Sequence, residues 1–122
     1  MNMSFVTVYT EKMAETIEFY TKVMGFEVQR QFSPRPGMEI AFLADQSGSV
    51  LEFIMDAETP RYEGRGISIG FNVEDMDETF KLMNDNNVEI VFGPIEMPNG
   101  VKLLHAKDLN GLELGFVQEI KR

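Results

Sequence analysis

The sequence predicts an α+β protein made of two βαβββ modules, whose strands form one curved eight-stranded mixed sheet with the helices on the outside. Three observations predict it: an internal repeat, one helical pattern in each half, and four apolar strand-like runs in each half. The chain of 122 residues suits a single domain, 1–122. We expect module 4–56 and module 65–120, joined by the charged, Gly- and Pro-containing linker 57–64.

The repeat has a constant offset. The segment "EKMAETIEFY" begins at Glu11, and "EDMDETFKLM" begins at Glu74, 63 positions later. The segment "DQSGSVLEF" begins at Asp45, and "DLNGLELGF" begins at Asp108, again 63 positions later. Between them, "GFEV" and "NVEIV" align best at an offset of 62. Two separated stretches with one offset indicate a duplication, with a one-residue insertion between them.

The first half opens with an apolar, β-branched run at 5–10 that predicts a strand. Apolar residues then recur at helical spacing from Met13 to Met24, and Gly25 follows as a typical helix terminator. The turn-like segments "SPRPG" and "DQSG" separate the strands that follow. These further strands are predicted at 26–32, 38–44 and 49–55.

The second half repeats this order. A strand is predicted at 66–73, and a helix is predicted from Met76 to Met83. Asp75 and Glu78 have the spacing of a capping box at its start. The remaining strands, separated by "MPNG" and "DLNG", are predicted at 88–95, 101–107 and 112–120. Pairing two such modules would give a concave sheet face, which is a natural place for a ligand.

Composition excludes several classes of partner and site. The net charge of −9 argues against nucleic acid and anionic membranes, which both require a basic surface. The absence of cysteine rules out disulfides and thiolate metal sites. No segment has the pattern of a secretion signal or a membrane span, so we expect a cytoplasmic protein. Ten Phe and nine Met suit either an ordinary core or an adaptable binding surface.

Two motifs carry a family resemblance. "FYTKVMGFEV" follows the first predicted strand, and "DLNGLELGF" precedes and enters the last. With the repeat, they resemble the vicinal oxygen chelate superfamily, which includes glyoxalase I, bleomycin-resistance proteins and extradiol dioxygenases. The resemblance implies the glyoxalase/bleomycin-resistance fold and a homodimer. It is specific for the fold and not for one chemistry, because this scaffold carries many functions.

Enzymes of this superfamily hold a divalent metal with one ligand on the first strand and one on the last strand of each half. The resemblance places these positions at Phe5, Glu52, Ser68 and Gly115. Only Glu52 is a good ligand among them, so we expect no metal and no other cofactor. A shift of two residues on the first strand would replace Phe5 with Thr7, which also offers no strong ligand.

His105, the only histidine, is the other candidate for chemistry. It lies where the resembling dioxygenases carry an acid/base residue in the pocket, and its repeat counterpart is the apolar Phe42. It could be a pocket group, a catalytic acid/base or a structural residue. Glu113 would share the strand face of Gly115, so the alternative to no metal is a divalent ion held by Glu52, His105 and Glu113. The predicted ligand-pocket residues are Phe5, Thr7, Phe42, Glu52, Ser68, His105, Glu113 and Gly115.

These observations favour a binding protein over an enzyme. The hypothesis is metal-independent sequestration of a small, partly apolar or aromatic molecule, as bleomycin-resistance proteins perform. The alternatives are a glyoxalase-type lyase or isomerase that uses Glu52 and His105, and a protein that acts through protein contacts alone. The loop arginines Arg35, Arg61 and Arg65 could recruit an anionic ligand or form surface ion pairs.

Overall fold

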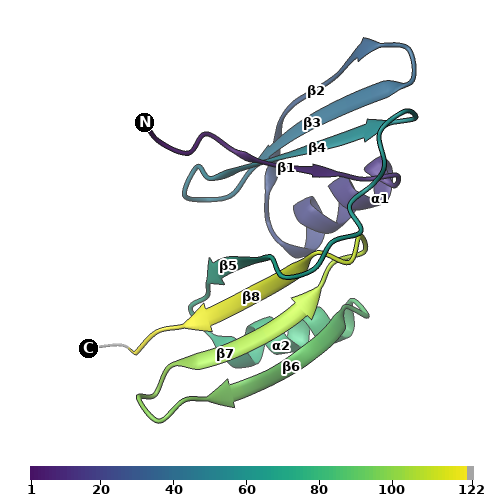
Figure 1. Cartoon of the computed structure of the whole chain (residues 1–122). Coiled ribbons are helices and arrows are strands. Elements are labelled where there is room, and N and C mark those ends of the chain that lie inside the picture. Colours follow the sequence, from purple (N-terminus) through teal and green to yellow (C-terminus); the bar gives the residue numbers. More distant parts are fainter. Residues whose placement is uncertain (121–122) are drawn as a thin grey trace. The chain divides into compact units, whose positions relative to one another are not determined.

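The chain divides into two compact units, Met1–Glu63 (unit 1) and Gly64–Arg122 (unit 2), in the computed structural model of the protein, which describes residues 1–120. Each unit contains a four-stranded sheet and one helical region (Figure 1). This confirms the two βαβββ modules. The strands pair within each unit, and the joining of the two sheets into one curved surface stays a prediction.

Unit 1 has its strands in the order β1-β4-β3-β2. Strand β1 runs parallel to β4, and the other two neighbouring pairs are antiparallel. The chain therefore crosses from one edge of the sheet to the other through its helical region. The elements of unit 1 are β1 (Val6–Tyr9), α1 (Met13–Glu18), η1 (Phe19–Val23), β2 (Glu27–Arg35), β3 (Met38–Ala44) and β4 (Val50–Asp56).

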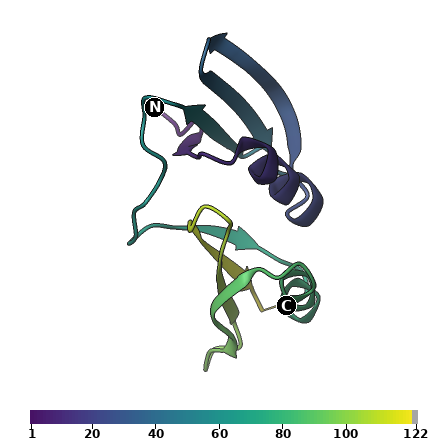
Figure 2. The same cartoon turned by 90° about the vertical axis from the view of Figure 1, so that its right-hand side faces the viewer.

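The helical region of unit 1 covers one face of its sheet. Helix α1 continues into the π-helical turn η1, in which the backbone N–H of Met24 donates to the carbonyl of Phe19 at 3.2 Å. Gly25 ends it at a φ of +78°, as its place in the sequence predicts. Tyr20 is fully buried, and its ring lies 5.0 Å from that of Phe53. The opposite face of the sheet has no helix on it (Figure 2).

Strand β2 is longer than the sequence indicates. The segment "SPRPG" reads as a turn, but β2 runs through Arg35, and only Pro36 and Gly37 form the turn. Proline is tolerated in β2 because the strand lies at the sheet edge, where its missing N–H breaks no ladder. The Ser33 hydroxyl donates to the Met38 carbonyl at 2.6 Å, which holds the two strands together beside the turn.

Unit 2 repeats the arrangement with the strand order β5-β8-β7-β6. Its core lies between α2 and one face of the sheet, where Met76, Met83, Leu104 and Leu114 are buried. The predicted cap of α2 is present, since the Asp75 carboxylate accepts from the backbone N–H of Glu78 at 3.1 Å. None of the helices in residues 1–120 is long and apolar enough to cross a membrane. The elements are β5 (Ser68–Asn72), α2 (Met76–Asp85), β6 (Glu89–Glu96), β7 (Lys102–Lys107) and β8 (Glu113–Gln118).

The repeated "D…G" segments form the same turn in both units. In unit 2 the Asp108 carboxylate accepts from the backbone N–H groups of Asn110 at 2.8 Å and Leu112 at 3.0 Å. In unit 1 the Asp45 carboxylate accepts from the backbone N–H groups two and four residues further on, both at 2.9 Å. Gly48 and Gly111 supply the positive φ angles, +89° and +80°. The repeat therefore preserves a turn that leads into the last strand of each unit.

Candidate functional site

A row of side chains crosses the helix-free face of the sheet in unit 1. Strand pairing places Thr7 opposite Glu52, Glu52 opposite Phe42, and Phe42 opposite Arg30. Paired residues on neighbouring strands point to the same face, and this face is opposite to that of Phe53, which follows Glu52 and packs on the helix. We call Thr7, Glu52, Phe42 and Arg30 the first row.

Glu52 is the acidic member of the first row. It is only 8% exposed, and the Thr7 hydroxyl donates to its Oε1 atom at 2.5 Å. A buried carboxylate is costly unless it is hydrogen-bonded, and Thr7 provides this partner. The partner of this buried carboxylate is therefore a hydroxyl on the neighbouring strand β1.

Aromatic rings surround the first row. The ring of Phe42 packs edge-on against Phe5 at 5.4 Å and is nearly parallel to Phe32 at 6.5 Å. The Arg30 guanidinium lies over both Phe32 and Phe42, 4.9 and 5.3 Å from their ring centres. Phe5 and Phe32 stay 45% and 36% exposed. Unit 1 therefore presents accessible aromatic surface beside a buried carboxylate and a guanidinium.

Unit 2 has the matching second row, made of Phe92, His105, Gly115 and Gly70. Strand pairing places Phe92 opposite His105, His105 opposite Gly115, and Gly115 opposite Gly70. His105, Gly115 and Gly70 stand 63 positions after Phe42, Glu52 and Thr7, in that order. Phe92 stands 62 positions after Arg30. The sequence repeat is therefore a structural repeat, and half of the second row has no side chain.

His105 fills the space above Gly115. A Cβ atom on Gly115 would lie 3.1 Å from Nε2 and 3.3 Å from Cε1 of the imidazole. The other ring nitrogen, Nδ1, lies 2.7 Å from a carboxylate oxygen of Glu113, and the ring stacks on Phe92 with centres 4.5 Å apart. Gly115 is buried beneath this ring, which explains a glycine in the middle of a strand.

The first-strand positions differ from those first taken from the family resemblance. Thr7, not Phe5, lies opposite Glu52, and Phe5 precedes β1. Ser68 lies opposite Glu113, and Gly70 lies opposite Gly115. Strand pairing favours the alternative register, because Thr7 and not Phe5 is the neighbour of Glu52.

The donor set of these positions does not fit the divalent metal of the superfamily. By strand register the four positions are Thr7, Glu52, Gly70 and Gly115, and glycine has no side chain that could coordinate. Within each unit, no three acidic or histidine side chains of residues 1–120 are grouped as metal ligands. Of the alternative metal set, the structure brings His105 and Glu113 together within unit 2.

Two of the loop arginines form ion pairs within unit 1. Arg35 pairs with Asp56 at 2.8 Å, and Arg61 pairs with Glu11 at 3.1 Å. Arg65 is exposed in the segment before β5. Arg35 therefore joins the end of β2 to the end of β4. Arg61, in the segment after β4, joins that segment to Glu11, which precedes α1.

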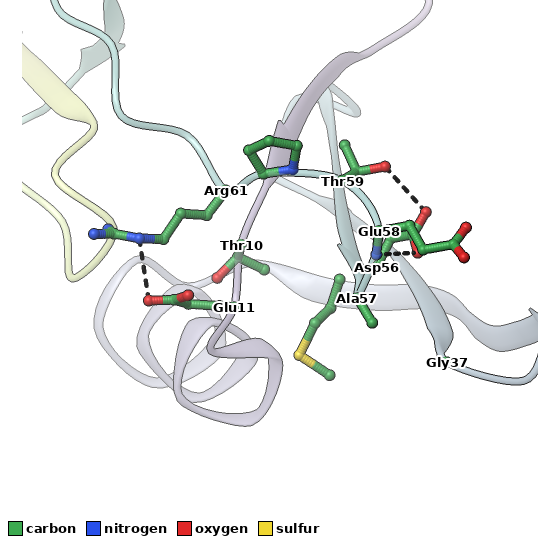
Figure 3. A pocket seen from close by; sticks show the side chains of 10 residues that line it. Thr10, Glu11, Gly37, Asp56, Ala57, Glu58, Thr59 and Arg61 are labelled. Atoms are coloured by element: carbon green, nitrogen blue, oxygen red, sulfur yellow. Dashed lines mark hydrogen bonds and ion pairs between the residues drawn. The ribbon is translucent and has the colours of Figure 1, made fainter.

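A pocket of about 540 Å³ lies between these ion pairs. Figure 3 shows Arg61 and Glu11 on one side of it and Asp56 with Thr59 on the other. The Glu58 backbone N–H donates to Asp56, and with the Thr59 hydroxyl and the Arg35 guanidinium it holds the pKa of this carboxyl below its ordinary value, against the effect of burial. No member of the first row lines this pocket.

Arg30, Phe92 and Gly70 are the members of the two rows that sequence reasoning did not identify. Arg30 stands two residues before Phe32 on the same strand, so period-two spacing could have placed the two on one face. Gly70 stands 63 positions after Thr7, so the repeat offset would have found it once the shifted register was adopted.

Comparison with known proteins agrees with this fold. A glyoxalase family protein from Bacillus cereus superposes with a TM-score of 0.85 at 19% identity, covering 99% of this chain and 95% of that one. TioX from Micromonospora sp. ML1 gives 0.76 at 18% identity, with 98% and 100% covered. The trypanothione-dependent glyoxalase I of Leishmania major gives 0.80 at 23% identity, with 98% and 87% covered. At these identities the likeness shows the fold alone.

Two sequence comparisons complete this picture. A search of curated protein sequences finds no significant match. Residues 2–116 match the profile of one family, which spans nearly the whole chain. The chain belongs to the Glyoxalase/Bleomycin resistance protein/Dioxygenase superfamily.

Proposed function

We propose that the protein binds a small, partly apolar or aromatic molecule on the helix-free sheet face, without a metal. The observation that carries the proposal is the first row with its surrounding rings: Phe5 and Phe32 are exposed around Phe42, next to the Arg30 guanidinium. Exposed aromatic faces beside a fixed cation suit a flat ligand, because stacking and cation–π contacts need no further partner.

The donor set supports binding without metal. Two of the four positions are glycines, and the one carboxylate, Glu52, is buried and accepts from Thr7. The superfamily name itself covers resistance proteins as well as enzymes. Sequestration requires affinity alone, so loss of the metal ligands is compatible with it.

A catalytic alternative is favoured by one observation, the His105–Glu113 pair at 2.7 Å. A carboxylate that orients an imidazole is a common arrangement for proton transfer. The alternative is a lyase or isomerase of the glyoxalase type with His105 as acid/base and Glu52 as a second polar group. Turnover that survives a chelator and is lost in His105→Gln would support it.

The binding proposal is tested by a thermal-shift screen of small aromatic compounds in the presence of a chelator. A compound held well above its dissociation constant stabilises a protein by a few kcal/mol. We expect aromatic stabilisers whose affinity falls about tenfold in Phe32→Ala, a loss of roughly one stacking contact.

Leu82→Ala is the matched control. Leu82 is 40% exposed, close to the 36% of Phe32, but lies on helix α2 of unit 2. The control variant should keep full affinity. Equal losses in both variants, or stabilisers that act only when a divalent metal is added, would contradict the proposal.

A further inference from the structure

Two neighbouring positions of the second row, Gly70 and Gly115, have no side chain. Gly70 and Gly115 lie opposite each other on β5 and β8, with His105 opposite Gly115 on β7. A Cβ atom on Gly70 would meet nothing within 4 Å, whereas one on Gly115 would meet the imidazole. Unit 2 therefore has open space over Gly70, beside the Nε2 edge of His105.

Glu113 fixes the orientation of the imidazole. Its carboxylate lies 2.7 Å from Nδ1, and Phe92 stacks on the ring with an interplanar angle of 17°. A carboxylate can only accept, so the hydrogen bond places a proton on Nδ1. In the neutral imidazole this leaves Nε2 with a free lone pair.

The Nε2 atom is available for a ligand. Of the two ring nitrogens of His105, Nδ1 makes the hydrogen bond to Glu113. No group of residues 1–120 makes a hydrogen bond to Nε2. No buried side-chain nitrogen of the described residues lacks a partner, so Nε2 reaches solvent. The imidazole is 23% exposed.

We propose that His105 Nε2 is a hydrogen-bond acceptor for a planar, uncharged ligand with an O–H or N–H donor at its edge, and that the ligand lies over Gly70. This inference rests on the proposed function for the chemical class of the ligand, and it concerns the sheet of unit 2 rather than the first row of unit 1. Glu113 is a positioning residue that acts through His105. An anionic ligand is disfavoured because the Glu113 carboxylate, 33% exposed, stands on the other side of the ring.

The test uses the fact that the chain has one histidine. In protein purified without a histidine tag, nitrogen-15 NMR of the imidazole reports its tautomer and its contacts without assignment. We expect the Nδ1–H tautomer in the free protein at mildly alkaline pH. Phenol at millimolar concentration should shift the Nε2 signal, and anisole, in which a methyl group replaces the donor hydrogen, should not.

Two variants separate positioning from binding. Gly70→Ala should leave the imidazole spectrum of the free protein unchanged. It should abolish the response of that spectrum to phenol, because the added methyl group occupies the space over residue 70 that the ligand would fill. Glu113→Gln should change the tautomer population of the free protein. His105→Gln should weaken phenol binding about tenfold, the loss of one hydrogen bond.

The inference is overturned if the free imidazole is protonated at Nε2, or if phenol and anisole shift its signals equally or not at all. These outcomes concern unit 2 alone. The proposed function fails separately, when no aromatic compound stabilises the metal-free protein or when Phe32→Ala and Leu82→Ala behave alike.

Discussion

The residue that most distinguishes the two units is Gly115, the counterpart of Glu52. In unit 1 the carboxylate of Glu52 points over the sheet face and accepts from Thr7. In unit 2 the same position has no side chain, and the imidazole of His105 occupies the space. In unit 2 the imidazole of His105 on β7 therefore occupies the space over β8 that corresponds to the carboxylate of Glu52 on β4.

The two glycines of the second row should respond in opposite ways to alanine. Gly115→Ala forces the imidazole to move and should cost about 1–3 kcal/mol of unfolding free energy, as overpacking does. Gly70→Ala meets open space and should be neutral or stabilising by about 0.4–1 kcal/mol, since it restricts the unfolded chain. Chemical denaturation of both variants checks this, and a loss from Gly70→Ala equal to that from Gly115→Ala would refute it.

The individual site residues were only partly predictable. The family motifs and the repeat singled out Glu52 and Gly115 by their place in the last strand of each half, and His105 was singled out as the only histidine. The contacts of these residues depend on strand register, which a run of apolar residues does not specify. A shift of two residues keeps the same face of the strand, so only the pairing of the strands distinguishes Thr7 from Phe5 and Gly70 from Ser68.

At the scale of elements, the turn before the last strand is the feature that the repeat preserves most closely. Asp108 is buried and accepts from two backbone N–H groups, whereas Asp45 makes the equivalent bonds at a more accessible turn. Both turns direct β4 and β8 into the centre of their sheets, next to the row residues.

Asp108→Ala should therefore destabilise the protein by about 1–3 kcal/mol, because it removes the acceptor of the buried Leu112 N–H and the half-buried Asn110 N–H. Asp45→Ala is the matched variant and should cost less, since water can replace the carboxylate at the exposed N–H groups of Ser47 and Ser49. Urea denaturation measures both, and the reverse order of losses would contradict this account.

The segment after β4 should make stability depend on pH. The pKa of Asp56 is held below its ordinary value of 3.8 by the Glu58 N–H, the Thr59 hydroxyl and Arg35. Because the folded pKa lies below the unfolded one, the carboxylate adds stability above the unfolded value, and this is lost as pH falls through the folded pKa.

Asp56→Asn should remove that contribution. The stability difference between the native protein and the variant is expected to be present at neutral pH and to shrink as pH falls below about 4. Denaturation curves recorded across the acid range test it. A difference that stays constant with pH would show that Asp56 acts without its charge.

At the scale of the whole molecule, the βαβββ order of both halves was predictable because turn segments and helical spacing recur at one offset. The ends of the elements were less predictable from the sequence. Strand β2 continues through Pro34, which is acceptable there because β2 lies at the edge of its sheet, and the sequence does not show which strand is at the edge. The homodimer remains a prediction from the family resemblance, and sedimentation equilibrium is its direct measurement.

The metal of the superfamily would need one donor from the first strand and one from the last strand of each unit. Unit 1 supplies Thr7 and Glu52, and unit 2 supplies two glycines with His105 above one of them. The chain therefore retains the scaffold, while the donor set has changed.

The metal content of the purified protein is the sharpest test of metal-independent binding. Elemental analysis by mass spectrometry is done on protein purified without chelator, from medium supplemented with zinc, nickel, manganese and iron. We expect far less than one metal ion per chain, and unchanged thermal stability after chelator treatment. A stoichiometric ion that is lost in Glu52→Gln or His105→Gln would contradict it.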